Sequence, residues 1–182
     1  MRLLLLSDIH SNLEALEACL NAAPAFDAIV NLGDIVGYGA SPNEVTDRVR
    51  KKGGTFVRGN HDKVVAGLEK VETFNPIAGL SALWNREHLS SDHLEWLRAL
   101  PKGPVAVFGV PGVQFVHGAA EDEDRYVVSM QDAITALATS DTSITFFGHT
   151  HIQGLFSLHG IGGQRPSRIR EYRKPGKLEF SA

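Results

Sequence analysis

The stretch "TFVRGNHD", residues 55–62, places an apolar run directly before a glycine and three polar residues. The apolar run is predicted to form a strand, and Gly59 permits the tight turn that follows it. The amide of Asn60, the imidazole of His61 and the carboxylate of Asp62 can bind a metal or move a proton. "GNHD" alone is equally compatible with a polar turn. The surrounding chain must therefore decide between a turn and a site.

Strands and helices alternate through the first third of the chain. Apolar runs at 3–6 and 28–32 predict strands, and the stretches 12–22 and 41–54 predict helices between them. Together with the strand at "TFVR", this order is β-α-β-α-β. It predicts an α/β protein with a parallel, buried sheet and right-handed crossovers. The following region, 62–100, is predicted to be mostly helical.

Short apolar runs in the second half predict more strands. These runs are "VAVFGV", "VQFVHG" and "SITFFGHTH", and a helix is predicted around 130–138 between the last two. "IQGLFSLHG" predicts a further strand, and the basic tail "QRPSRIREYRKPGKLEF" predicts one or two edge strands. We expect one domain over 1–182, with a short or atypical part after about residue 155.

Polar side chains follow five successive apolar runs, in "SDIH", "GDIVGYG", "GNHD", "VHG" and "GHTH". In open α/β sheets, ligands bind at the carboxyl ends of the strands. Each motif by itself is compatible with a turn or a structural histidine. Their conjunction favours a shared site, because clustering so many titratable groups without a metal is expensive. The side chains expected to meet there are Asp8, His10, Asp34, Asn60, His61, Asp62, His117, His149 and His151.

The ligand types of this set indicate transition metals. Carboxylate, amide and imidazole ligands without thiolate suit Mn²⁺, Fe, Co²⁺, Ni²⁺ or Zn²⁺. Three acid-or-amide ligands and four imidazoles are too many for one tetrahedral zinc. They suit two metals that share a bridging carboxylate, ~3.5–4 Å apart. Such a pair can clamp phosphate oxygens and bind a water as hydroxide, which is the apparatus for attack on phosphorus.

The ordered motifs Asp-x-His, Gly-Asp-x-x-Gly, Gly-Asn-His-Asp, a strand-end His and Gly-His-x-His resemble the calcineurin-like metallophosphoesterase superfamily. The resemblance covers about residues 1–155 and is closest to the small bacterial single-domain phosphoesterase branch. It implies a four-layer α-β-β-α sandwich with two mixed β-sheets and a metal site at the carboxyl ends of the strands. It also implies metal-dependent hydrolysis of phosphoesters by a dinuclear centre with a metal-activated hydroxide.

The resemblance further implies a role for each matching residue. His61 is expected to donate a hydrogen bond or a proton near the phosphate and the leaving-group oxygen, and Asp62 to orient His61. Manganese is the expected metal, with Fe, Ni, Zn and Co as alternatives. The ligands implied are Asp8, His10, Asp34 and His151 for one ion and Asp34, Asn60, His117 and His149 for the second, with Asp34 bridging.

Three further residues are candidates for substrate contacts. Arg58 precedes the "GNHD" turn and can reach a substrate phosphate, or it can be solvated or ion-paired. Arg125 and Tyr126 end the acidic stretch "AAEDEDRY", which is most simply a solvated loop but can also reach the substrate pocket. Related members carry an Asn-Pro-Gly-Ser-like turn and closing strands after Gly-His-Thr-His. Here "GIGGQRPSRIREYR" is only a faint echo, which leaves the closing strands of the second sheet in question.

Composition limits the partners. The net charge is −3, with 43% hydrophobic and 21% charged residues. This charge favours a small phosphoester as substrate over a nucleic-acid polymer. Candidates are phosphodiesters such as cyclic nucleotides, phosphomonoesters, dinucleoside polyphosphates and phosphoprotein. Neither a secretory signal nor a membrane span is apparent, so a soluble, cytoplasmic protein is expected.

Two other expectations follow from the sequence. The single cysteine, Cys19, is expected to be a small buried hydrophobe. The alternative to an enzyme is a catalytically silent metal- or ligand-binding module on the same fold. No residue of the ligand set is missing, which favours the enzyme. The sequence indicates no oligomeric state.

Overall fold

The first sheet is parallel, as the alternating pattern predicts. A computed structural model of the chain describes residues 1–140, 142–159 and 168–172. The strands pair in the order β1-β2-β3, with Leu3 opposite Ala28 and Val30 opposite Thr55. The elements are β1 (Leu3–Leu6), α1 (Leu13–Ala22), β2 (Ala28–Asn31), α2 (Pro42–Lys52) and β3 (Thr55–Phe56).

Helices follow in the region predicted to be helical. They are α3 (Asn60–Val65), the 3₁₀ helix η1 (Val71–Thr73), α4 (Pro76–His88) and α5 (Ser91–Arg98). Asn75 and Ser90 cap α4 and α5 by accepting hydrogen bonds from backbone N–H groups of the first turn. The cap of α1 is Asn12, whose side chain accepts from the N–H of Ala15.

The second half adds two small sheets and a helix. β4 (Val113–Phe115) and β5 (Ile144–Phe146) are parallel, β6 (Leu155–His159) and β7 (Arg168–Tyr172) are antiparallel, and α6 spans Met130–Ala138. The strand expected at "VAVFGV" is reduced to one antiparallel bridge between Val105 and Phe115. The chain turns away soon after, at Gly109, whose φ is +80°.

The expectation of two mixed sheets is not confirmed. Within the described residues, the β1–β3 and β4–β5 sheets are purely parallel and the β6–β7 pair is purely antiparallel. A mixed second sheet needs antiparallel neighbours for β4 and β5, and the segment at Val105 supplies only a bridge. Most of the tail predicted to form edge strands lies outside the described residues. The fold is α/β, and the four-layer arrangement stays a prediction.

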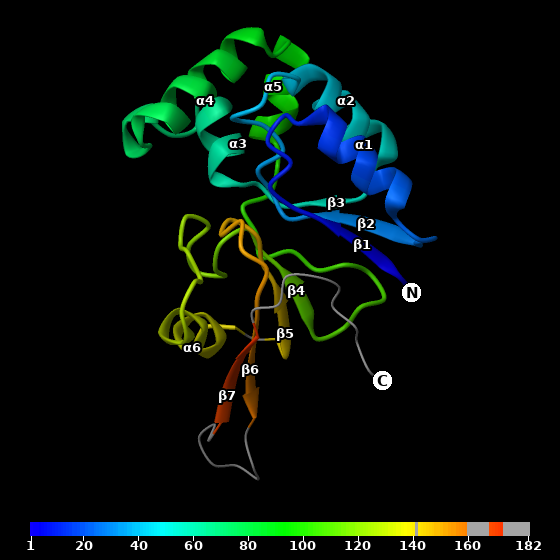
Figure 1. Cartoon of the computed structure of the whole chain (residues 1–182), viewed down its shortest axis with the longest axis vertical. Coiled ribbons are helices and arrows are strands. Elements are labelled where there is room, and N and C mark those ends of the chain that lie inside the picture. The colour runs from blue at the N-terminus through cyan, green and yellow to red at the C-terminus, as the bar shows by residue number, and fades with distance from the viewer. Residues whose placement is uncertain (141, 160–167, 173–182) are drawn as a thin grey trace.

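The core is built on both faces of the first sheet. Side chains alternate across a strand, so Leu6 packs with the helices while Leu3 and Leu5 face the other way. The helix side contains buried Val45, Val65 and similar residues. Figure 1 shows α1–α5 on one side of the β1–β3 sheet and β4, β5 and α6 on the other. The residues that follow β1 and β2 and those that follow β4 and β5 meet between these two halves.

Two findings bear on the remaining expectations. No helix in the part of the chain that the structure describes is long and apolar enough to cross a membrane. Cys19 is exposed on α1, so the prediction that it is buried is wrong. The reason is that Cys19 lines a surface pocket beside α1 and does not pack into the core as Leu16 does.

Candidate metal centre

The strand-end residues come together as the strand order predicts. Asp8 and His10 follow β1, Asp34 follows β2, and Asn60 begins α3 directly after β3. His117 follows β4, and the remaining two histidines follow β5. Two groups have ligand atoms that all lie within 4.8 Å of one another, and Asp34 belongs to both. These groups are Asp8, His10, Asp34 and His151, and Asp34, His117 and His149.

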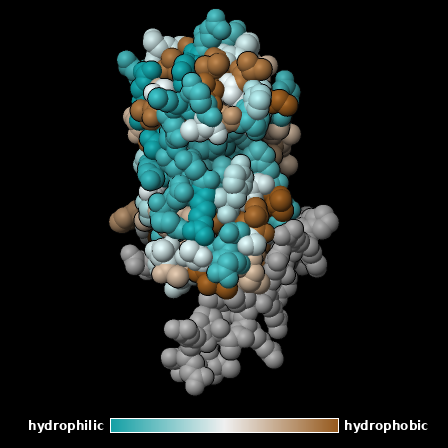
Figure 2. All heavy atoms as spheres, turned by 90° about the vertical axis from the view of Figure 1, so that its left-hand side faces the viewer, coloured by the Kyte–Doolittle hydropathy of each residue, from teal (hydrophilic) through white to brown (hydrophobic). Residues whose placement is uncertain are grey.

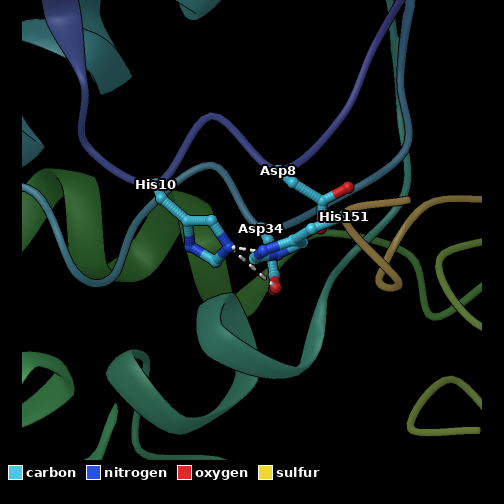
Figure 3. Close-up of side chains that lie close together, drawn as sticks. All are labelled: Asp8, His10, Asp34 and His151. Carbon is cyan, nitrogen blue, oxygen red and sulfur yellow. Dashed lines mark hydrogen bonds and ion pairs between the residues drawn. The ribbon is translucent and has the colours of Figure 1, made fainter. Parts of the chain in front are cut away.

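In the first group, the side chains point at a common centre (Figure 3). The Nε2 atom of His10 lies 3.0 Å from Nε2 of His151 and 3.6 Å from Oδ2 of Asp34. The Nε2 atom of His151 is 3.4 Å from Oδ1 of Asp8. Two imidazole nitrogens facing two carboxylates at this spacing form a donor set that fits a divalent transition metal.

The second group meets the first at Asp34. Nε2 of His117 is 3.4 Å from Oδ2 of Asp34 and 3.1 Å from Oδ1 of Asn60. The rings of His117 and His149 are 4.8 Å apart between centroids. Asn60 thus joins this group through its amide oxygen, so all seven predicted ligands lie in one cluster.

Hydrogen bonds to backbone carbonyls fix which ring nitrogen is free. Nδ1 of His10 lies 3.2 Å from the carbonyl of Val36, and Nδ1 of His117 lies 2.8 Å from that of Leu32. A carbonyl accepts only, so each Nδ1 carries a hydrogen and Nε2 is the nitrogen that faces the cluster. His149 is the reverse case, because its Nε2 lies 3.1 Å from the carbonyl of Asp124. Its Nδ1 is therefore the free nitrogen.

Burial and mutual charge set the protonation of the cluster. Burial lowers the pKa of His10 and of His149 by disfavouring their charged forms. Burial also opposes a charge on His117, but the adjacent Asp34 carboxylate outweighs it and raises the pKa of His117 to about 9. In the same way, His117 outweighs burial and lowers the pKa of Asp34. His117 thus favours its charged form beside Asp34, while His10 and His149 favour their neutral forms.

The backbone is strained where it presents these ligands. Seven described non-glycine residues have positive φ, and five of them are predicted metal ligands. Such a conformation is uncommon outside glycine, although Asp and His adopt it more readily than most residues. It persists only where the surrounding structure enforces it, and it concentrates at functional sites. The five are Asp8 (φ +54°), His10 (+51°), Asp34 (+55°), His149 (+66°) and His151 (+52°).

The "GNHD" turn packs directly against the turn that carries Asp34. A Cβ atom on Gly59 would overlap both the backbone nitrogen and the carboxylate of Asp34. The N–H of His61 donates to Oδ1 of Asp34 at 2.8 Å. Gly59 is therefore needed for close approach, and the approach brings Asn60 to the shared carboxylate.

Asp62 does not contact His61 in the manner expected. Its Oδ1 accepts from the N–H groups of Ile35 (2.8 Å) and Val36 (3.1 Å), and its Oδ2 accepts from that of Gly59 (3.0 Å). Burial, reinforced by Asp34, raises the pKa of Asp62 to about 7 against the effect of these donors. The hydrogen bond expected between this carboxylate and the His61 ring is not formed. Asp62 instead ties the Asp34 turn to the "GNHD" turn.

His61 lies buried among rings. Its centroid is 4.6 Å from that of Tyr38, 4.5 Å from that of Phe74 and 4.8 Å from that of His10. Its Nδ1 is buried and has no hydrogen-bond partner among the described residues. Burial lowers the pKa of His61 to about 4. The ring is held beside the metal ligands by packing and not by a carboxylate.

The three predicted substrate contacts separate into two kinds. The Arg58 guanidinium binds Glu123, with Nη2 2.9 Å from Oε1 and 3.2 Å from Oε2. Arg125 pairs with Glu121 at 2.8 Å. Both arginines are therefore ion-paired, which was the alternative for Arg58. Tyr126 does lie at the site, because its ring stacks on His149 with centroids 3.8 Å apart.

Two pockets flank the cluster. The larger, about 640 Å³, lies beside α1 and is lined by Asp8, His10 and His151 among others. The smaller, about 300 Å³, lies beside α4 and is lined by Asn60 and His149. The side of the molecule that carries α4 and α6 is largely hydrophilic at its centre (Figure 2).

Sequence reasoning missed some residues of these pockets. Tyr38 lines both, and its place between two glycines in "GDIVGYG" was an available signal. Phe74 and Lys63 line the smaller pocket. They occupy a region predicted only as helical, and nothing in their spacing marks them.

Comparison with known proteins agrees with this geometry. A family model, the calcineurin-like phosphoesterase superfamily domain, matches residues 1–174. The chain is 35% identical over 159 residues to the uncharacterized protein MJ0912 of Methanocaldococcus jannaschii, a match that covers 85% of this chain and 64% of the relative.

Solved structures are similar as well. A metallophosphoesterase from Sphaerobacter thermophilus aligns with a TM-score of 0.74 and 36% identity, over 87% of this chain and 63% of that protein. The hypothetical protein PH1004 from Pyrococcus horikoshii shares the fold, with a TM-score of 0.69 and 17% identity over 84% of this chain and 71% of its own. The chain thus spans less than two thirds of the length of the Methanocaldococcus and Sphaerobacter proteins.

Proposed function

Because the chain belongs to the calcineurin-like phosphoesterase superfamily, we propose that it hydrolyses phosphoesters with two divalent metal ions held by the strand-end cluster. The observation that supports this most is the sharing of Asp34 between two convergent donor groups. The ring nitrogens that His10, His117 and His149 turn toward the cluster, set by carbonyl partners on their other nitrogens, fit the donor requirement of such ions.

The donor set divides between two ions. Manganese is the proposed metal, and Fe, Ni, Zn and Co suit the same ligand types. When bound, two divalent ions supply Lewis-acid polarisation of the phosphate and activation of the attacking water. Asp8, His10, Asp34 and His151 would hold one ion, and Asp34, Asn60, His117 and His149 the other.

The protein supplies positioning around this centre. In the proposed reaction, water adds to phosphorus, the P–O bond to the leaving alcohol breaks, and the departing oxygen takes up a proton. His61 would donate a hydrogen bond or that proton, because its ring is fixed beside the ligands and lines the smaller pocket. Asp62 would act through the backbone, by keeping the turns that carry Asp34 and Asn60 together.

The proposed substrates are small phosphodiesters or phosphomonoesters. The net charge of −3 provides no broad basic field for a nucleic-acid polymer. The two arginines near the site are neutralised by Glu123 and Glu121, so they add no free positive charge there.

The test is hydrolysis of bis-p-nitrophenyl phosphate and p-nitrophenyl phosphate by the purified chain with Mn²⁺, Ni²⁺, Zn²⁺ or Mg²⁺. We expect His61→Ala to lower kcat about 10²–10⁴-fold while the bound metal, measured by mass spectrometry, stays near that of the parent. His88→Ala is the matched control, because His88 is an exposed histidine stacked on Trp84. A chain that binds metal yet hydrolyses neither ester would instead be a catalytically silent module.

A further inference from the structure

The smaller pocket, called the α4 pocket below, is the side on which a leaving group fits. It is lined by His61, Asn60 and His149, whereas the larger pocket is lined by Asp8, His10 and His151. A phosphoryl group bound at the cluster would therefore lie between the two pockets. His61 lines only the α4 pocket. The group that receives its hydrogen bond or proton must then extend into that pocket.

Aromatic side chains wall the α4 pocket. Tyr38, Phe74 and Tyr126 all line it. Tyr126 stacks one part of its ring on His149 and is still 55% exposed, and Tyr38 is 45% exposed. Exposed aromatic surface next to buried polar ligands is typical of sites that bind planar rings. A volume of about 300 Å³ is small and suits one ring system.

The charge of the α4 pocket argues against a second phosphate. Among the described residues that line it, Lys63 carries the one lysine or arginine side chain. Its Nζ lies 2.5 Å from a carboxylate oxygen of Glu69, 2.6 Å from one of Asp124 and 3.3 Å from one of Glu123. Three carboxylates more than neutralise this ammonium. A leaving group with its own phosphates would meet no free cation here.

We propose that the α4 pocket binds a neutral, planar aromatic leaving group on a substrate with a single phosphate, with the ring held by Phe74 and Tyr126. This inference rests on the proposed function, which places the phosphate at the metal cluster and the leaving-group oxygen at His61. An aryl alcohol and a nucleoside both present such a ring. The pocket disfavours dinucleoside polyphosphates, whose leaving groups are anionic.

Binding of two phosphonates, which cannot be hydrolysed, tests the pocket directly. Benzylphosphonate and cyclohexylmethylphosphonate have the same charge and linker and differ in whether the ring is planar and aromatic. With Mn²⁺ present, we expect benzylphosphonate to bind the parent chain about tenfold more tightly in calorimetry, since aromatic pairs contribute about 0.5–1.5 kcal/mol beyond area. Because the cyclohexyl ring is the more hydrophobic, such a preference could not arise from apolar burial alone.

Substitutions then locate the preference. Phe74→Leu and Tyr126→Leu should reduce the tenfold ratio to about twofold or less, while both variants still bind cyclohexylmethylphosphonate, which shows that they are folded. Phe108→Leu is the control, because Phe108 is 98% exposed and lines none of the pockets described above. Equal affinities in the parent chain, or a ratio unchanged in both variants, would overturn the proposal.

Turnover separates this inference from the proposed function. Benzyl phosphate and cyclohexylmethyl phosphate release alcohols of similar basicity, so their hydrolysis compares ring recognition and not leaving-group chemistry. A phosphonate preference without turnover would refute the enzyme and keep the aromatic pocket. Turnover without a preference would support the enzyme and refute the aromatic pocket. A nucleoside 5′-phosphonate that binds more tightly than benzylphosphonate identifies a nucleoside as the natural ring, and weaker binding identifies a simple aryl group.

Discussion

At the scale of single residues, the ion pairs beneath the site explain the position of the 119–126 segment. Glu123 is 5% exposed and accepts from Arg58, and it also lies 3.3 Å from the ammonium of Lys63. The backbone carbonyl of the next residue, Asp124, accepts a hydrogen bond from Nε2 of His149. Arg58 thus supports the candidate metal centre indirectly. It anchors the segment whose backbone carbonyl binds His149.

A double-mutant cycle tests this role. Glu123→Gln should destabilise the fold by about 1–3 kcal/mol, because the partly buried guanidinium of Arg58 loses its carboxylate partner. Arg58→Met should also destabilise it, and the double variant should be more stable than the sum of the single changes predicts. Urea unfolding measures all four proteins. Additive effects would show that the two side chains are not coupled.

The clustering of the predicted ligands could be predicted from sequence, whereas their supporting contacts could not. Asp8, Asp34 and His117 follow apolar runs, and parallel strands end at one edge, so local patterns predict their meeting. The partner of Arg58 lies 65 residues away, in a stretch that has only the composition of a solvated loop. The bonds of Asp62 go to backbone groups, which carry no side-chain signature.

At the scale of elements, the turn after β3 depends on Gly59 for space and not for conformation. Its φ is −94°, which any residue can adopt, but a Cβ would overlap Asp34. Gly53, at the end of α2, is the opposite case. Its φ is +69° and a Cβ there would meet nothing within 4 Å.

These two glycines give a matched pair of variants. Gly53→Ala should lower the free energy of unfolding by about 1–2 kcal/mol and leave the metal content unchanged. Gly59→Ala should reduce the metal content sharply, because the "GNHD" turn must move away from the shared carboxylate. Thermal unfolding and metal analysis on both proteins check the contrast. Equal metal content in the two would contradict it.

Element type was easier to predict than sheet composition. The alternating pattern predicts β1, β2, α1 and α2 correctly, because each helix has an apolar stripe and each strand is an apolar run. β4 and β5 also fall in runs predicted as strands, "VQFVHG" and "SITFFGHTH", but the makeup of their sheet was not predictable in the same way. β4 and β5 have only three residues each. The turn at Gly109 ends the apolar run "VAVFGV", which was expected to form a strand before them.

At the scale of the whole molecule, the cluster joins the two halves seen in Figure 1. Asp8, Asp34 and Asn60 come from the β1–β3 sheet, while His117 and His149 follow the β4–β5 sheet. A metal bound by both sets would bridge the sheets. Folding and metal binding should therefore be linked.

Mn²⁺ should raise the midpoint of thermal unfolding. At a free concentration of about 100 times Kd, one ion stabilises the folded chain by about 2.7 kcal/mol, which for a chain of this size is about 5–10 °C. Asp34→Asn should abolish most of the shift, because both donor groups use this carboxylate. Asp92→Asn should keep it, because Asp92 is an exposed partner of Arg50. A shift that persists in Asp34→Asn would place the ions elsewhere.

The positive φ angles at the ligands have a consequence for the evolution and engineering of this chain. At His151, glycine would relieve the backbone and remove a ligand in the same step. Selection for stability alone would therefore disfavour the predicted ligands at these positive-φ positions. A redesign that ranks substitutions by folding free energy would replace the predicted ligands first, and would return a more stable protein without the candidate metal centre.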